Sequence, residues 1–390
     1  MRVLAAAVCF AIRLFAGNPL VDDGYQHFYN LEYDEALADF DQAIAQDPSN
    51  PDLHNHAAET IVFREMYRDG ALESELVTGN NSLLRRAKLN PTAQTQDRFL
   101  DEIQKALSLE QARLRHNPND TGALYAMGIT YGLRANWFFL VKKAWLDSLH
   151  DATNARKLHN RISELDPSNV DARLVQGLHD YVIGSLPLAY RMAGFLIGFH
   201  GDRERGIRTV EDVAAHGSLN RIDAQIFLAV IYRRERQPAK ALPVVEDLIR
   251  QFPRNYLLRF ELAGMYAALG DGKNAIGSIN EVARLKTAGA PGFSRVPWEM
   301  IYYHLGTIQF WSNHLDQALV NMQKVTAHAD EVDLNMGVLA WMRVGQIYDL
   351  TQRHDLAIEA YKKAIAYAPE AEAARESRRY ISSPYRREKS

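Results

Sequence analysis

The stretch WMRVGQIYDLTQRHDLAIEAYKKAIAYAP, residues 341–369, decides the fold. Trp341, Gly345 and Tyr348 place a large, a small and an aromatic side chain on one face of a first helix. Small and aromatic residues then recur on one face of a second helix, and a proline closes the unit. The full pattern is Trp341, Val344, Gly345, Tyr348, Ala357, Tyr361, Ala364 and Pro369.

The same pattern recurs upstream. Ala241 and Ala275 hold equivalent places 34 residues apart, and the next equivalent, Ala318, follows after 43. The surplus falls in 286–298, whose glycines and prolines predict a loop. The upstream units are marked by Leu228, Ala229, Tyr232, Ala241, Val245, Leu248 and Pro253, by Leu262, Ala263, Tyr266, Ala275, Ile279 and Val282, and by Tyr302, Leu305, Gly306, Ala318, Met322 and Val325.

The N-terminal half is less regular. One unit spans residues 21–48, and the linker DPSN occurs at 47–50 and again at 166–169. In this linker the proline stops one helix and a polar residue can cap the next. Residues 64–116 contain no clean repeat, but their apolar period predicts an amphipathic helix from about Thr95 to Arg115.

A further unit opens at 170–181, and its second helix is expected at 202–216 with Val210 and Val213 facing inward. An apolar insertion, 182–200, therefore separates the two helices. Because Pro187 and Arg191 interrupt this run, we expect a buried helical segment that packs against 137–145. Contact of 181–199 with a membrane surface is the weaker alternative.

These units resemble the tetratricopeptide repeat, whose 34-residue period and residue pattern they share. The resemblance covers nearly all of the sequence after its first segment. It implies an all-α superhelical solenoid of helix-turn-helix repeats with an inserted helical hairpin in the middle. Such a repeat cannot bury its apolar face alone and must stack on its neighbours. No strand-like alternation persists along the sequence, in agreement with an all-α fold.

A narrower resemblance rests on SLPLAYRMAGFLIGFHGDRERG, residues 185–206. This stretch is similar to the inclusion-body-clearance and tetratricopeptide repeat protein thirty-nine family. That similarity implies an intracellular adaptor in lipid or inclusion-body homeostasis. The segments REMYR, 64–68, and YGLRAN, 131–136, are instead similar to uncharacterised exported bacterial repeat proteins.

The N-terminus has the outline of a secretory signal peptide. One basic residue precedes an apolar run that is shorter than the roughly 20 residues needed to cross a bilayer, and Ala16 and Gly17 follow. We therefore expect an exported protein, periplasmic or associated with a bacterial envelope, with a cytoplasmic protein as the alternative. The single cysteine, Cys9, lies in this segment, so a cleaved chain has no thiol for a disulfide or for catalysis.

These features divide the chain into five parts. They are a signal peptide at 1–16, an N-terminal repeat and irregular helical region at 17–116, divergent repeats with the insertion at 117–219, a C-terminal repeat array at 220–369, and a capping helix and tail at 370–390. The polar tail suits the cap that a solenoid needs for solubility. A net charge of −3 gives no basic footprint for nucleic acid.

Two motifs could mark a ligand site, but each has a simpler interpretation. His54 and His56, with Glu59 and His27, suggest a metal, yet residues two apart on a helix point to different faces. The glycine-rich segment 270–273 lacks the first glycine and the final Ser or Thr of a phosphate loop, so we expect a turn there. We predict no metal and no cofactor.

The sequence favours a non-catalytic protein-interaction scaffold. Nucleophile-elbow, zinc-protease and paired-cysteine motifs are missing from the sequence, so an enzyme is not expected; an unrecognised site in a helical array is the alternative. The predicted partner is a protein or peptide in the concave groove, which first helices line, and about half of the candidates should be inter-repeat core. The candidates are Tyr25, Phe28, Tyr29, Tyr125, Tyr181, Arg233, Arg234, Phe260, Tyr303, Phe310, Trp311, Met342 and Gln346.

Overall fold

The structure is a computed structural model that describes residues 18–70, 72, 88–186, 192, 200–332 and 334–387. Regular secondary structure within these residues is helical throughout, which confirms the all-α prediction. The predicted signal peptide lies outside the described residues and stays a prediction.

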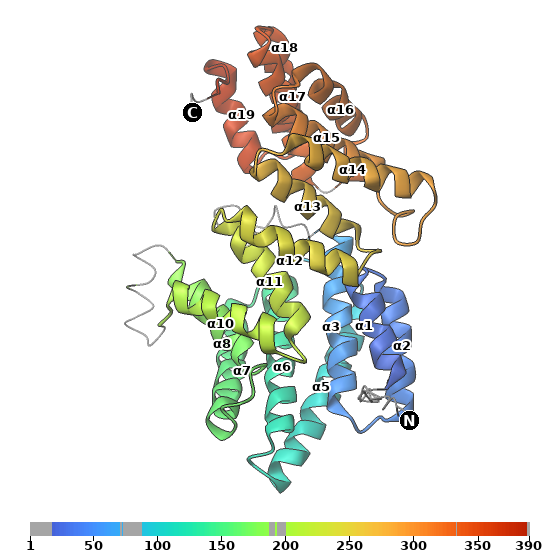
Figure 1. Cartoon of the computed structure of the whole chain (residues 1–390), viewed down its shortest axis with the longest axis vertical. Helices are drawn as coiled ribbons and strands as arrows, with labels where there is room; N and C mark the ends of the chain where they lie inside the picture. Colours follow the sequence, from blue (N-terminus) through green and yellow to red (C-terminus); the bar gives the residue numbers. More distant parts are fainter. Residues whose placement is uncertain are drawn as a thin grey trace, which may run out of the picture.

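Consecutive helices pack in pairs that stack along the molecule, as a repeat solenoid requires (Figure 1). The pairs are α1 (Pro19–Tyr29) with α2 (Tyr33–Gln46), α3 (Pro51–Arg68) with α5 (Ala93–His116), α6 (Thr121–Trp137) with α7 (Trp145–Leu165), α8 (Arg173–Gly184) with α10 (Arg203–His216), α11 (Arg221–Arg234) with α12 (Pro238–Gln251), α13 (Tyr256–Ala268) with α14 (Gly272–Thr287), α15 (Trp298–Trp311) with α16 (Leu315–Ala327), and α17 (Leu334–Leu350) with α18 (His354–Tyr367). Two short helices, η2 (Phe138–Lys142) and η3 (Ala329–Glu331), and a final helix, α19 (Glu372–Ser382), complete the described elements.

The polar linkers precede helices as their sequence predicts. The Asn50 side chain accepts the Asp52 N–H at 3.1 Å and caps α3, which satisfies a backbone donor that has no partner inside the helix. Proline at the first position of α3 adds to this, because its fixed φ suits a helix start. Asn169 instead accepts the Ala172 N–H at 3.1 Å in the turn before α8, whose own N-cap residue, Ala172, makes no side-chain cap bond.

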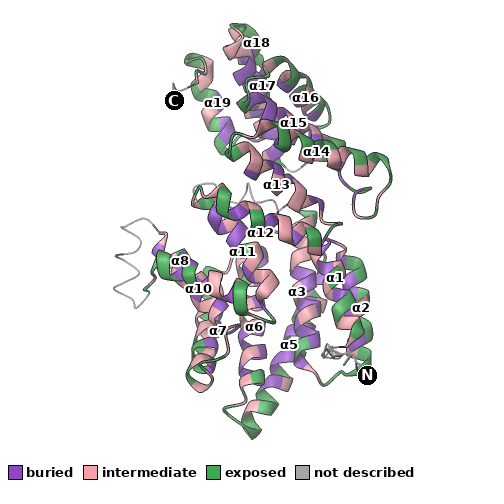
Figure 2. Ribbon diagram, viewed as in Figure 1, coloured by how far each residue is buried: buried purple, intermediate pink, exposed green. Residues whose placement is uncertain are grey.

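The small residue of the repeat pattern is required by close packing within a helix pair. A Cβ added to Gly345 would lie 2.4 Å from Cε1 of Tyr361, and one added to Gly24 would lie 2.6 Å from Cε1 of Phe40. Both rings are fully buried. Glycine on the first helix therefore makes room for the large side chain that the second helix turns toward it. Figure 2 shows the result, with buried residues along the facing sides of the helices.

The glycine-rich segment 270–273 forms the predicted turn. Gly270 has a φ of +80°, which L residues with side chains adopt only with strain, and it joins α13 to α14. The Asp271 side chain then accepts the Asn274 N–H at 3.0 Å and caps α14.

Most of the insertion, 187–191 and 193–199, lies outside the described residues, so its predicted contact with 137–145 is not placed. Trp137 is buried and stacks on Phe99 with ring centroids 4.1 Å apart, whereas Trp145 is 43% exposed. Within the described residues, no helix has the length and apolar character needed to span a membrane.

The C-terminal segment covers the end of the last helix pairs. Ala374 and Ser377 of α19 are fully buried, and α19 packs on α17 and α18. Beyond this helix the Tyr385 N–H donates to Asp349 at 2.8 Å, and Arg387 lies over the Phe310 ring, 4.9 Å from its centroid. The tail thus continues from the capping helix onto α15.

Candidate functional site on the inner face of the N-terminal ring

The first five helix pairs, α1 to α12, close on themselves and form what we call the N-terminal ring (Figure 1). The turn after α1 returns to the turn between α12 and α13. The Arg254 guanidinium donates two hydrogen bonds of 2.8 Å to Glu32, and the Arg254 N–H donates to Asn30 at 2.9 Å. These partners are more than 220 residues apart, although a repeat in an open solenoid contacts only its neighbours.

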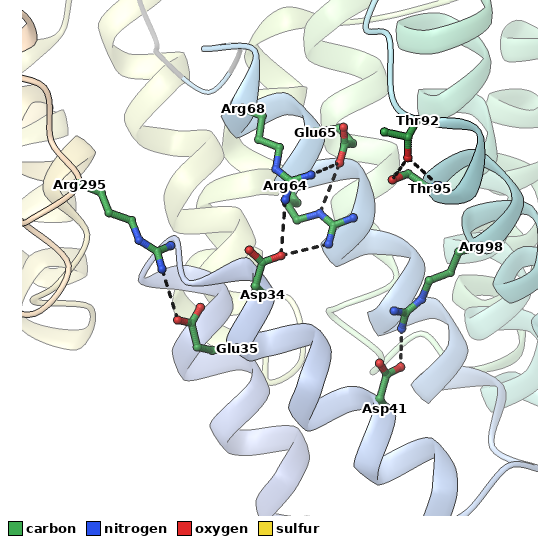
Figure 3. A network of polar contacts seen from close by, with 10 residues as sticks. All are labelled: Asp34, Glu35, Asp41, Arg64, Glu65, Arg68, Thr92, Thr95, Arg98 and Arg295. Carbon is green, nitrogen blue, oxygen red and sulfur yellow. Dashed lines mark hydrogen bonds and ion pairs between the residues drawn. The ribbon is translucent and has the colours of Figure 1, made fainter. Parts of the chain in front are cut away.

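Further contacts along this closure are aromatic and ionic. Tyr29 packs on Phe252 with ring centroids 4.8 Å apart, and the Asn255 amide donates to the Tyr29 carbonyl at 2.8 Å. Figure 3 shows the Arg295–Glu35 ion pair at 3.6 Å, which ties the loop before α15 to α2. The closure therefore involves both turns and helices.

Figure 3 also shows how neighbouring helix pairs of the ring are joined. Arg64 of α3 donates to Asp34 of α2 at 3.1 Å, and Arg98 of α5 pairs with Asp41 of α2. Exposed ion pairs of this kind contribute at most about 1 kcal/mol each. They align the helices, whereas apolar burial supplies most of the stability.

Six half-buried side chains face one another from α1, α3, α6 and α11. They form the inner cluster, which consists of Tyr25, Tyr29, His56, Glu59, Tyr125 and Asp223. Each keeps part of its surface exposed, so the cluster is a surface as well as an interhelical contact.

Hydrogen bonds and stacking order the inner cluster. The Tyr29 hydroxyl donates to Oδ1 of Asp223 at 2.9 Å, across 194 residues of sequence. The Tyr25 hydroxyl lies 2.7 Å from Nδ1 of His56. The rings of Tyr25 and Tyr29 stack with centroids 5.8 Å apart and planes at 18°. Two stacked aromatic rings are thereby fixed beside Asp223.

The two carboxyl groups of the inner cluster are held in an unfavourable setting for negative charge. Burial raises the pKa of Glu59, and repulsion from Asp223 raises it further. Burial also raises the pKa of Asp223, although the hydrogen bond from Tyr29 offsets part of this effect. Among the described residues, no lysine or arginine forms an ion pair with either carboxyl group.

The remaining titratable groups of the cluster are neutral at pH 7. Burial lowers the pKa of His56 to about 4, so its ring carries no charge. Burial and the nearby Glu59 and Asp223 hold the pKa of Tyr25 well above its ordinary value. The Tyr25 hydroxyl therefore keeps its proton. The cluster combines aromatic faces with acceptors that lack a cationic partner.

A second layer positions Tyr125. Its ring meets the His159 ring edge-to-face at 5.2 Å, and Asn220 hydrogen-bonds to its side chain. Asn220 is itself anchored, because its N–H donates to Asp171 at 2.8 Å and its side-chain amide donates to the Asp171 carbonyl at 3.0 Å. The turn before α11 thus sets both Tyr125 and the start of the helix that contains Asp223.

The predicted metal motif has its side chains directed to separate partners. His54 pairs with Glu102 at 2.7 Å, His56 contacts Tyr25, and His27 lies 2.7 Å from Asp39. The described part of the chain contains no group of three or more His, Cys, Asp or Glu that could hold a metal ion.

The predicted groove residues fall into two groups. Seven of the thirteen are buried in the core between helices, where about half are expected: Phe28, Tyr181, Phe260, Tyr303, Phe310, Met342 and Gln346. The reason is geometric, since adjacent residues on a helix differ by about 100° in direction and the periodic aromatic positions turn toward the partner helix. The other six keep exposed surface: Tyr25, Tyr29, Tyr125, Arg233, Arg234 and Trp311.

The three tyrosines of the inner cluster are among the residues that the sequence predicts, whereas its two acids are not. The sequence places Glu59 only beside the histidines of the metal motif. Asp223 lies in the first turn of α11, where an acidic residue is common and favourable, so nothing marked it. Only the closure of the ring brings it to Tyr29.

Comparison with known proteins agrees with this architecture. Two models described as tetratricopeptide repeat match residues 228–290 and 338–370. The chain contains tetratricopeptide repeats. No curated protein matches this chain, and the narrower family resemblances are not confirmed.

Solved structures similar to this chain include the APC/C hetero-tetramer Cut9–Hcn1, with 13% identity and a TM-score of 0.52. The alignment covers 94% of this chain and 56% of that chain, so the protein spans little more than half the length of that relative. Yeast Tom70 has 12% identity, a TM-score of 0.41 and coverage of 94% of both chains. YrrB, described as having an unusual peptide-binding site, has 17% identity and a TM-score of 0.31, with coverage of 69% of this chain and 97% of that chain.

Proposed function

We propose that this protein is a non-catalytic protein-interaction scaffold, exported to a bacterial envelope, that holds a partner peptide on the inner face of its N-terminal ring. The repeat family supports an interaction role in general. The location of the peptide site on the inner face rests on the inner cluster. In this cluster, half-buried aromatic and acidic side chains from four helices converge. Tyrosine is among the residue types that dominate binding hot spots.

The C-terminal helix pairs support this location by contrast. Their buried Phe310 ring already has two cations of the chain over it, since Arg343 lies 4.2 Å and Arg387 lies 4.9 Å from its centroid. Within the N-terminal ring, Arg233 of α11 donates two bonds of 2.8 Å to Glu261 of the following α13. The inner cluster has no comparable cation among the described residues and so offers the more open recognition surface.

Affinity capture tests the interaction. The chain from residue 18 onward serves as bait in an envelope extract, beside a Glu59→Gln, Asp223→Asn double variant and a Glu359→Gln control, whose side chain is 65% exposed. We expect one protein to be recovered by wild type and control, and its purified form to bind the double variant at least tenfold more weakly. Equal binding by all three baits would contradict the inner-face location, and recovery of no specific partner would contradict the scaffold.

Export is tested separately by fusing residues 1–30 to alkaline phosphatase, which is active only after translocation. Activity and cleavage after Ala16 are the expected results. An inactive fusion and an intact N-terminus in the cytoplasm would instead favour the adaptor in lipid or inclusion-body homeostasis.

One observation favours a second function, acid–base catalysis. Glu59 and Asp223 are two neighbouring carboxyl groups whose raised pKa values suit a group that must donate a proton near neutral pH. Paired carboxyl groups of this kind hydrolyse glycosidic bonds in many enzymes. A panel of nitrophenyl glycosides tests this. Turnover that Asp223→Asn abolishes would support catalysis, and no turnover above the double variant would contradict it.

A further inference from the structure

The inner cluster has the chemistry of a receptor for positive charge. Two carboxyl groups lie beside the stacked rings of Tyr25 and Tyr29. Aromatic faces attract cations, and carboxylates form strong charge-assisted bonds with ammonium and guanidinium groups. An anionic ligand would meet Glu59 and Asp223 with no described base to balance them.

The hydrogen bonds inside the cluster leave acceptors in excess. Tyr29 donates to one oxygen of Asp223, and Tyr25 is engaged with His56. Glu59 forms no hydrogen bond with another described residue that would neutralise it, yet it lies close enough to Asp223 for their charges to repel. A ligand that brings several N–H donors and a positive charge would satisfy both acids at once.

The rest of the molecule indicates which group fits. On the inner side of α11 and α13, Arg233 neutralises Glu261 beside the stacked rings of Phe260 and His304, whose centroids are 4.2 Å apart. Carboxylate, aromatic ring and arginine therefore occur together there. The inner cluster repeats the carboxylates and the rings but has no arginine of its own among the described residues.

We propose that the inner cluster binds one organic cation, the ammonium or guanidinium group of a lysine or arginine side chain in a partner peptide. This inference rests on the proposed scaffold function and names the chemistry that its partner presents. Tyr25 and Tyr29 supply the aromatic wall, and Glu59 and Asp223 supply the counter-charge. Tyr125 of α6 is a further aromatic neighbour of the two acids.

Binding of a cation has a consequence for protons. A positive charge between the acids favours their ionised forms, so protons leave the site when the ligand enters near pH 7. The other titratable groups around the pair remain neutral or add negative charge. They are Tyr25 and Tyr29 of α1, Asp52 and His56 of α3, Tyr125 of α6, and Asp171 before α8.

Calorimetry on the chain from residue 18 onward tests the proposal. The probes are N-acetyl-arginine amide and N-acetyl-lysine amide, with neutral N-acetyl-glutamine amide as the matched control and spermidine as a free polyamine. We expect both cationic amides to bind wild type at least tenfold more tightly than the neutral amide, with proton release when two buffers of different ionisation enthalpy are compared. Glu59→Gln and Asp223→Asn should each weaken binding at least fivefold, whereas Glu359→Gln should not.

The outcomes separate this inference from the scaffold proposal. Equal binding of cationic and neutral amides to wild type, which needs no variant to fold, would overturn the cation site even if a protein partner is captured. Binding of spermidine at least tenfold tighter than either amide would overturn the peptide source and assign the site to a free polyamine. Binding of the amides without any captured protein would leave the cation site standing and would contradict the scaffold.

Discussion

The N-terminal ring and the C-terminal helix pairs are built from the same repeat, but the repeats close on themselves only in the ring. From α13 to α18 each helix pair contacts its neighbours, and Arg343 and the tail residue Arg387 lie over the buried Phe310 ring. From α1 to α12 the pairs curve until the first meets the turn after the last. The difference teaches that closure, rather than the repeat itself, brings unneutralised acids and aromatic rings together.

The largest expected effect tests whether the ring unfolds as one unit. Phe40→Ala should cost about 3–5 kcal/mol, because Phe40 is fully buried in the first helix pair. Hydrogen exchange should then speed up in α11 as well as in α1 to α3, since Tyr29 joins α1 to Asp223. The control, Met322→Ala, removes a fully buried side chain between α15 and α16. Faster exchange confined to α1–α3 in Phe40→Ala would show that closure does not couple the ends of the ring.

The next effect tests the packing of glycine on one helix against a large side chain on its partner helix in the C-terminal pairs. Gly345→Ala should cost about 2–3 kcal/mol, because its Cβ would lie 2.4 Å from the rigid, buried ring of Tyr361. Gly306→Ala should cost less than about 1 kcal/mol, because the nearest atom is the flexible Cε of Met322 at 3.0 Å. Urea unfolding measures both, and equal losses would contradict the steric explanation.

A smaller effect compares two arginine–glutamate pairs with the same two-bond geometry. Arg254→Ala should cost about 1–2 kcal/mol, because its bonds to Glu32 close the ring and are partly shielded from water. Arg284→Ala should cost no measurable stability, because its pair with Glu281 lies within one helix and is solvent-exposed. If thermal unfolding gives the same loss for both, the Arg254 pair adds nothing beyond a surface contact.

The smallest effect concerns pH and the charge on Glu59. Its pKa is raised in the folded protein, so the native state binds the proton more tightly and loses stability as the pH rises from the ordinary glutamate range through the folded pKa. Glu59→Gln removes this loss. The variant should match wild type at about pH 4.5 and be more stable by about 1 kcal/mol at about pH 8. If Glu59→Gln is no more stable than wild type at the higher pH, ionisation of Glu59 does not lower the stability of the folded protein.

The helix pairs were predictable because each depends on local spacing. Gly345 and Tyr361 stand 16 residues apart and meet wherever the two helices pack, so the pattern alone indicates their contact. The cap at Asn50 is local in the same way. The site was only partly predictable, since Tyr25, Tyr29 and Tyr125 lie on first helices, but the burial of Phe28 or Tyr303 depends on which way a neighbouring pair turns.

The sequence by itself therefore determined the repeat type, the helix pairs, their turns and the small residues that large rings require. Tertiary structure alone decided that the repeats close into a ring, because small rotations between successive pairs accumulate over more than 220 residues before Asn30 meets Arg254. It also decided that Glu59 and Asp223 share one setting. An acidic residue on a helix is ordinary in sequence, and its electrostatics depend on which distant helix is packed against it.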